Sequence, residues 1–199
     1  AADYLGLASA LSRSADPRLA ITHGLPGPGK SFVAQGVIEA ARAIAVRSDV
    51  ERKRLFGLDA LASSHDVVPG GIYGEEVTQR VYARLHEVAN AALIGGWPVV
   101  VDAACLLRAE RADFAALAGS RAAPISIFDC QAEAPLLRQR LAQRQAVGAD
   151  ASEADAAVLE HLSGIDQPLD AAESAVALAV DAARPASPAT LAQRWLAAV

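Results

Sequence analysis

The sequence has few cysteines and no long apolar run. Its two cysteines, Cys105 and Cys130, do not make a disulfide framework, and both fall in or just after apolar runs, as small buried residues do. No apolar run approaches the roughly 20 residues that a membrane-spanning helix needs, and no signal peptide is visible, so we expect no membrane association and a cytoplasmic setting. Because the chain starts at Ala1 without methionine, we expect a trimmed form or a segment of a longer protein.

Aromatic residues and positive charge are also scarce. Aromatic side chains make up 5% of the 199 residues, and the net charge is -5 at neutral pH. Both values argue against a nucleic-acid-binding protein with a base-stacking platform or a broadly basic surface, although a local basic groove would not show in the net charge. Hydrophobic residues make up 53% of the chain, which is enough to bury the core of one generous domain.

A glycine-rich stretch at 24–31, GLPGPGKS, fits the phosphate-binding pattern G-x-x-x-x-G-K-[ST]. The glycines let backbone N–H groups turn inward as an anion nest, a lysine reaches the β- and γ-phosphates of a nucleotide, and a hydroxyl ligates Mg²⁺. An apolar run at 19–22 and a helical pattern at 31–42 supply the strand and helix that the motif requires. The candidate residues are Gly24, Gly27, Pro28, Gly29, Lys30 and Ser31.

Strands and helices alternate along the chain, which predicts a parallel α/β sheet covered by helices on both faces. We expect strands at 19–22, 43–46, 99–102, 125–128 and 176–180, and helices at 31–42, 50–56, 75–94, 108–118, 133–145, 152–162 and from 187 onward. A capping box is expected to open the helix at 152. We expect the chain to divide into an N-terminal helix and linker at 1–17 and a nucleotide-binding domain at 18–199. This domain is expected to include a flap (58–73) and a helical lid (133–162).

Two aspartates follow apolar strands at the edge where ligands bind in parallel sheets. Asp102 ends the strand at 99–102, as an acid that holds Mg²⁺ does, although a plain turn residue is the alternative. The residue after it is Ala103 rather than glutamate, which argues against a hydrolytic motor. Asp49 is a candidate general base for an acceptor hydroxyl. Its alternative role is the N-cap of a helix beginning at Val50.

Cationic side chains surround these acids. Arg47 and Arg52 flank Asp49 and are candidates for binding an anionic group on the acceptor, with solvated surface charge as the alternative. Arg140 and Arg144 share a helix face, from which they can fold over the triphosphate, or they are solvated as well. His65 lies in the flap and is a candidate contact to substrate.

These stretches together resemble the zeta-toxin/polynucleotide-kinase-like group of P-loop kinases. The resemblance covers about 19–181 and rests on GLPGPGKS, VRSDVERKRLFG at 46–57, VVVDAACLLRAER at 99–111 and LRQRLAQRQA at 137–146. More narrowly, it is similar to bacterial ATP-binding domains fused behind an aminoglycoside-phosphotransferase-like domain. The resemblance implies an adenylate-kinase-like P-loop NTPase fold, a three-layer αβα sandwich with five parallel strands. It also implies ATP with Mg²⁺, Asp49 as base, Arg144 as the favoured lid arginine, and a fused or separate phosphotransferase-like partner.

Three functions stay open at this point. The first is an ATP-dependent kinase that phosphorylates a hydroxyl of a small molecule; ATP is favoured over GTP because no N-K-x-D guanine-reading motif is present. The second is a 5′-hydroxyl nucleic-acid kinase, which the acidic net charge disfavours. The third is a regulatory ATP-binding module without an acceptor.

Overall fold

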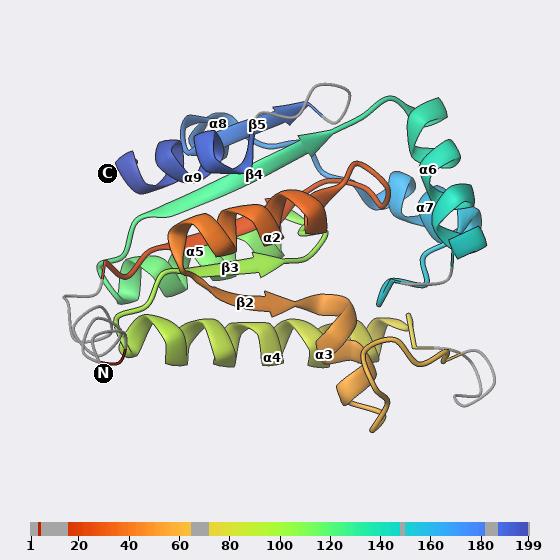
Figure 1. Ribbon diagram of the computed structural model, residues 1–199, viewed down its shortest axis with the longest axis horizontal. Helices are drawn as coiled ribbons and strands as arrows, with labels where there is room; N and C mark the ends of the chain where they lie inside the picture. Colours follow the sequence, from red (N-terminus) through yellow and green to blue (C-terminus); the bar gives the residue numbers. More distant parts are fainter. Residues whose placement is uncertain (1–3, 5–15, 65–71, 148–149, 182–186, 199) are drawn as a thin grey trace.

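The computed structural model describes the chain except residues 1–3, 5–15, 65–71, 148–149, 182–186 and 199 (Figure 1). Its five strands are β1 (Leu19–His23), β2 (Ile44–Arg47), β3 (Val99–Asp102), β4 (Ile125–Gln131) and β5 (Ala177–Asp181). They lie in the order β2-β3-β1-β4-β5, and all the pairings are parallel. The predicted five-stranded parallel sheet is therefore confirmed.

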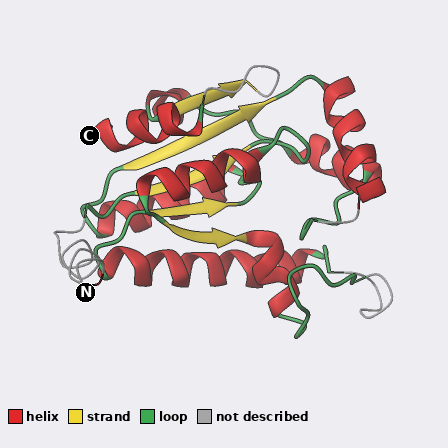
Figure 2. Ribbon diagram, in the orientation of Figure 1, coloured by secondary structure: helices red, strands yellow, loops and turns green. Residues whose placement is uncertain are grey.

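Helices cover both faces of this sheet (Figure 2). They are α2 (Lys30–Ala41), α3 (Ser48–Arg54), α4 (Glu75–Ile94), α5 (Arg108–Ser120), α6 (Ala134–Val147), α7 (Ala156–Ile165), α8 (Ala171–Ala175) and α9 (Pro188–Ala197). α2 and α9 pack on one face, and α4 and α5 pack on the other (Figure 1). α6 and α7 stand beyond the carboxyl ends of the strands.

The central strand β1 is buried along its whole length because both of its faces meet helices. Leu19 and Ile21 belong to the core that includes α4 and α5, whereas Ala20 belongs to the core that includes α2 and α9. On the second side, Phe128 meets Trp195 edge to face with ring centroids 5.9 Å apart. Successive strand residues thus alternate between two apolar layers, which is why the strands read as continuous apolar runs.

Most predicted elements occur within a few residues of their expected positions. The helix at 75–94 and the strand at 99–102 have the predicted bounds, and the short α8 was not predicted. The predicted N-terminal helix lies almost entirely outside the described residues; Tyr4, the one described position, is exposed. Of the flap, 58–64 and 72–73 are described, and Ser64 and Ile72 are buried. None of the described helices is long and apolar enough to span a membrane.

The predicted capping box that begins at Ser152 is wrong. α7 begins at Ala156, and its N-cap is Asp155, whose carboxylate accepts a hydrogen bond from the Val158 N–H at 2.9 Å. Ser152 lies ahead of the helix, and the Glu153 carboxylate contacts Lys53 and Ser64 instead of the start of α7.

Candidate active site

The loop between β1 and α2 adopts a conformation that its glycines make possible. Gly24, Gly27 and Gly29 have positive φ angles of 130°, 103° and 95°, which side chains rarely tolerate. A Cβ on Gly24 would also lie 2.3 Å from the carbonyl oxygen of Cys130. The sheet approaches the loop this closely only because no side chain intervenes.

Hydrogen bonds fix the loop to the end of β3. The Thr22 hydroxyl donates to the carbonyl of Ala103 at 2.6 Å and accepts from the Ala103 N–H at 3.0 Å. The Gly24 N–H donates to the carbonyl of Ala104 at 3.1 Å. The loop is therefore held beside Asp102, the last residue of β3.

Lys30 begins α2, and its ammonium turns back onto the loop. Its Nζ donates to the carbonyls of Gly24 at 2.8 Å and Leu25 at 2.7 Å. Burial lowers the pKa of Lys30, and the negative charge of Asp102 opposes this shift. The one lysine of the motif thus carries its charge at the centre of the loop, next to the N-terminal end of a helix.

Asp102 and Ser31 together suit a magnesium ion. Burial raises the pKa of Asp102, while a hydrogen bond with Ser31 and the positive charges of Arg47 and Lys30 lower it. A hydroxyl and a carboxylate are the hard oxygen ligands that Mg²⁺ takes, and beside nucleotide phosphates it needs only one or two carboxylates. No group of three or more His, Cys, Asp or Glu side chains among the described residues is arranged to hold a metal ion by itself. The residues present therefore fit Mg²⁺ bound jointly with phosphate.

Asp49 lies in the first turn of α3, not ahead of it. The helix begins at Ser48, and its N-cap is Arg47, which makes no capping hydrogen bond through its side chain. The alternative prediction, that Asp49 caps a helix beginning at Val50, is therefore wrong. Its negative charge acts on Lys30, Asp102 and Arg52.

The two arginines beside Asp49 have different surroundings. Arg47 Nε lies 3.4 Å from Asp102 Oδ2, and its Nη2 pairs with Asp150. Arg52 is buried; its guanidinium donates to the Ile72 carbonyl at 2.9 Å and lies over the Tyr73 ring, 5.0 Å from the centroid. The Nε atoms of both arginines have no hydrogen-bond partner among the described residues.

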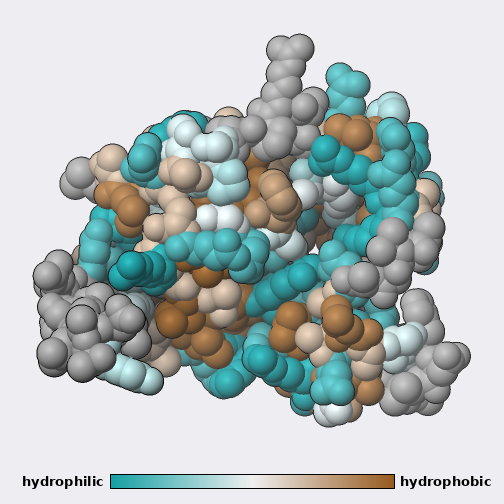
Figure 3. All heavy atoms as spheres, in the orientation of Figure 1, coloured by the Kyte–Doolittle hydropathy of each residue, from teal (hydrophilic) through white to brown (hydrophobic). Residues whose placement is uncertain are grey.

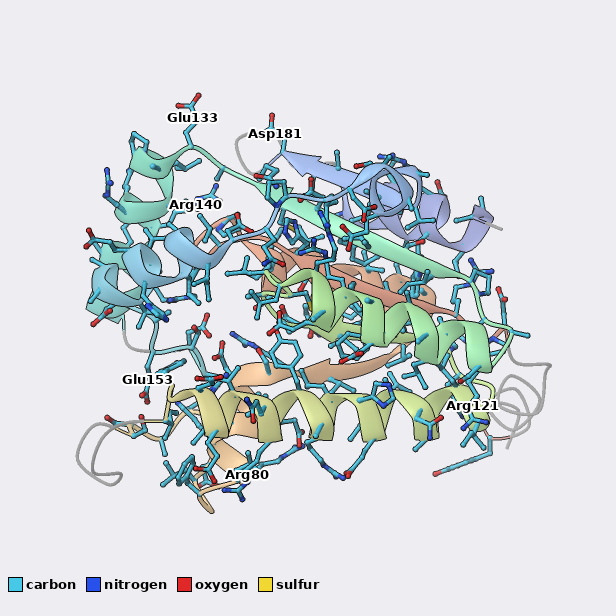
Figure 4. The ribbon with its side chains drawn as sticks, turned by 180° about the vertical axis from the view of Figure 1, so that it is seen from behind. Arg80, Arg121, Glu133, Arg140, Glu153 and Asp181 are labelled. Carbon is cyan, nitrogen blue, oxygen red and sulfur yellow. The ribbon has the colours of Figure 1, made fainter. Side chains whose placement is uncertain are left out.

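Helix α6 brings one arginine to the loop and a second to the cleft. Arg140 points from α6 toward it and donates to the Pro28 carbonyl at 3.0 Å (Figure 4). Arg144 donates to the Ala154 carbonyl at 2.8 Å. Arg138 is exposed, and hydrophilic residues cover the outer side of α6 (Figure 3). As the helical spacing indicates, Arg140 and Arg144 face inward together.

These groups line one cleft of about 1740 Å³ between the loop and helices α3, α4, α5, α6 and α7. Pockets for a single small ligand usually measure about 300–1,000 Å³, so the cleft has room for two substrates. Among the predicted site residues, those that line it are Gly27, Gly29, Lys30, Ser31, Asp49, Arg52, Asp102, Arg140 and Arg144. Gly24, Pro28 and Arg47 contact lining residues, and His65 lies outside the described residues.

Sequence reasoning missed Asp150, which lines the cleft and pairs with Arg47. In the sequence it stands between the helices expected at 133–145 and 152–162. No local sequence pattern identifies Asp150 as a functional acid, because its partner Arg47 is 103 residues away.

Comparison with known proteins agrees with this architecture. Residues 19–165 match the protein family described as "AAA domain". Three uncharacterised proteins, two from Mycobacterium tuberculosis strains and one from Mycobacterium bovis, are each 30% identical to the chain over 156 residues. That match covers 78% of this chain but 31% of each relative, so the chain spans about a third of their length.

Solved structures with the same fold include several kinases. A putative kinase from Chloroflexus aurantiacus has a TM-score of 0.69 at 20% identity, covering 90% of this chain and 96% of that one. A sugar kinase from Janibacter has a TM-score of 0.64 at 19% identity, covering 90% and 94%. The Mycobacterium tuberculosis APS kinase CysC, in complex with AMPPNP and APS, has a TM-score of 0.60 at 21% identity, covering 90% and 95%. The chain has a P-loop kinase fold, and it belongs to the AAA domain family.

Proposed function

We propose that this chain is an ATP-dependent phosphotransferase that moves the γ-phosphoryl group of ATP to a hydroxyl of a small molecule. The observation that supports it is a single cleft in which Lys30, Asp102 and Asp49 lie together. A cleft with space for one ligand beside the loop would suit nucleotide binding alone. The additional volume, between α3, α4 and α5, suits a second substrate.

The loop provides the binding site for the phosphates. Its backbone N–H groups and the start of α2 attract anions, and Lys30 exchanges its two carbonyl contacts for phosphate oxygens. Ser31 and Asp102 would hold Mg²⁺, which when bound neutralises charge on the β- and γ-phosphates. Arg140 and Arg144 add positive charge from the lid, where charge spreads over the transferred group.

Asp49 acts on the acceptor. Its carboxylate accepts a hydrogen bond from the acceptor hydroxyl and orients the oxygen toward the γ-phosphorus. The new O–P bond forms as the bond from that phosphorus to the β,γ-bridging oxygen breaks, the hydroxyl proton passes to Asp49, and ADP leaves. Arg52, whose Nε has no hydrogen-bond partner in the described part of the chain, and Arg47 are the groups proposed to bind an anionic part of the acceptor.

The kinase neighbours named above include one that acts on a sugar and one in complex with APS, which supports a small-molecule acceptor. The narrower kinship with the zeta-toxin/polynucleotide-kinase-like group is part of the proposal. So is a fused or separate phosphotransferase-like partner, which the greater length of the mycobacterial relatives supports.

A screen of acceptors tests the proposal. Purified protein with Mg²⁺ and ATP is incubated with a library of hydroxyl-bearing metabolites, aminoglycosides and a 5′-hydroxyl oligonucleotide, and mass spectrometry detects the gain of one phosphoryl group. We expect a small molecule to gain the group with wild type and not with Lys30→Ala. A gain on the oligonucleotide alone would favour a nucleic-acid kinase. Tight nucleotide binding without any gain would favour a regulatory module.

A further inference from the structure

A short segment between α6 and α7 joins the two sides of the cleft. Residues 150–155, which we call the strap, follow the lid helix α6 and pass toward α3 and the start of α4. Ala151 and Ala154 in the strap are buried. Asp150, Ser152 and Ala154 line the cleft. The strap is therefore a packed wall of the site.

Glu153 fixes the strap to the acceptor side (Figure 4). Its Oε1 lies 3.2 Å from Lys53 Nζ and accepts a hydrogen bond from the Ser64 N–H at 2.9 Å, while its Oε2 accepts one from the Ser64 hydroxyl. Its own N–H donates to the Tyr73 hydroxyl at 3.0 Å. Lys53 is 1% exposed, and a buried ammonium requires a charged partner, so this contact is costly to break.

The strap also contacts Arg47, which lies beside Asp102, and Arg144, which lines the cleft. Asp150 pairs with Arg47, and the Ser152 N–H donates to the Asp150 carboxylate at 2.9 Å, which orients it. The Ala154 carbonyl accepts the hydrogen bond from Arg144. A segment fixed at Glu153 thus sets the positions of one arginine beside the metal site and one in the lid.

Arg47 is shared between two carboxylates. It pairs closely with Asp150, while its Nε stays 3.4 Å from Asp102 without a hydrogen-bond partner among the described residues. If the strap moved away, Arg47 would lose Asp150, and its guanidinium would turn to Asp102, the carboxylate that already lies 3.4 Å from its Nε. A carboxylate in such a pair is a poorer ligand for Mg²⁺, because the arginine occupies its oxygens.

We propose that the strap keeps Asp102 available to Mg²⁺, and that Glu153 is the positioning residue that fixes the strap. This inference rests on the proposed function for the identity of the metal site. Glu153 does not line the cleft itself; it acts through Asp150 and Arg47. Residues that orient metal ligands typically change metal affinity by 10–100-fold when they are replaced.

Three variants test the inference. Glu153→Gln removes the charge that pairs with Lys53, and Asp150→Asn removes the charge that pairs with Arg47. Glu160→Gln is the matched control, because Glu160 is exposed on α7 outside the strap. Should Glu153→Gln fail to fold, Asp150→Asn still tests whether the strap holds Arg47 away from Asp102. Asp150 is only half-buried, so its replacement disturbs the fold less.

The first measurement is calorimetric binding of AMPPNP at increasing Mg²⁺ concentration. We expect Glu153→Gln and Asp150→Asn to need at least about tenfold more Mg²⁺ for half-maximal binding, and Glu160→Gln to match wild type. The second is hydrogen exchange without ligand, where we expect Glu153→Gln to speed exchange in 150–155 and at Ser64. A role in stability alone would lower the melting temperature without changing the Mg²⁺ requirement.

An unchanged Mg²⁺ requirement in folded Glu153→Gln and Asp150→Asn proteins would overturn the inference, as would unchanged exchange in the strap. Neither measurement depends on phosphoryl transfer. A protein that shows both expected responses but phosphorylates no acceptor would contradict the proposed kinase function and leave the positioning role supported.

Discussion

Replacing Asp49 with asparagine separates the catalytic role of this residue from its structural one. Asn has nearly the same shape but cannot accept a proton. Asp49 lies in the first turn of α3, where its charge interacts favourably with the helix dipole, and it does not cap the helix. Losing that interaction costs about 0.3–1 kcal/mol of folding free energy. The structural effect of Asp49→Asn should therefore be small.

The expected effect on catalysis is larger. A positioned general base contributes about 10²–10⁴-fold to a rate, which corresponds to about 2.7–5.4 kcal/mol of activation free energy. We expect Asp49→Asn to lower kcat by that factor while the affinity for nucleotide stays close to wild type. Because the expected loss of activation free energy is several times the expected loss of folding free energy, the experiment separates the two roles.

The assay is steady-state phosphoryl transfer to the acceptor that the screen identifies, with nucleotide affinity measured by calorimetry on the same preparations. Asp59→Asn is the matched control, because Asp59 is exposed and does not line the cleft. A wild-type rate in Asp49→Asn would refute the assignment of Asp49 as base. A parallel loss of nucleotide affinity would mean that Asp49 organises the site rather than accepting the proton.

Three further predictions concern the loop and the strap. Lys30→Ala should fold but lose most of its affinity for ATP with Mg²⁺, because the backbone N–H groups of the loop cannot replace a full positive charge; nucleotide affinity equal to wild type in calorimetry would show that the loop does not bind phosphate as proposed. Gly24→Ala should cost about 1–3 kcal/mol from backbone strain alone, and more from the clash with the Cys130 carbonyl; an unchanged melting temperature would contradict this. Burial acts to raise the pKa values of Asp150 and Glu153, but hydrogen bonds and cationic partners outweigh it and hold both values below their ordinary range. Their stabilising contribution is thus present above about pH 4.5 and lost as pH falls through the lowered values, so denaturant titrations should show a steeper acid loss of stability in wild type than in the Asp150→Asn, Glu153→Gln double variant.

The elements that were predicted to the residue have strong local patterns. α4 shows an apolar face over five turns, with Val81 and Leu85 fully buried, and it follows a glycine and ends at another. β3 is apolar until Asp102 and is buried on both faces. In such segments the local pattern and the tertiary environment favour the same structure, so the sequence is sufficient.

The start of α7 could not be predicted because two interactions compete for Glu153. The pattern from Ser152 to Asp155 is typical of a capping box, but the buried Lys53 and Ser64 bind the Glu153 carboxylate instead. These partners lie far away in the sequence, so no local pattern reveals them. The connection of Arg47 to Asp150 was missed for the same reason.

The start of α3, beside Asp49, was also predicted at the wrong residue. The expected strand ended at 46 and the observed one ends at Arg47, while α3 starts at Ser48. A shift of two residues in the start of the helix changes Asp49 from a cap to a residue of the first turn. Cap assignments depend on the exact terminal residue, which sequence patterns place least well.

The position of β1 in the sheet has a consequence for how the protein is made. β1 ends at residue 23, but its two neighbours are β3 at 99–102 and β4 at 125–131. Pairing over such separations must close long loops before it yields contacts, which slows folding. During synthesis, the phosphate-binding motif therefore leaves the ribosome about a hundred residues ahead of the strand whose Cys130 carbonyl packs against Gly24. A nascent chain carries the complete motif long before it has a sheet on which that motif can bind nucleotide.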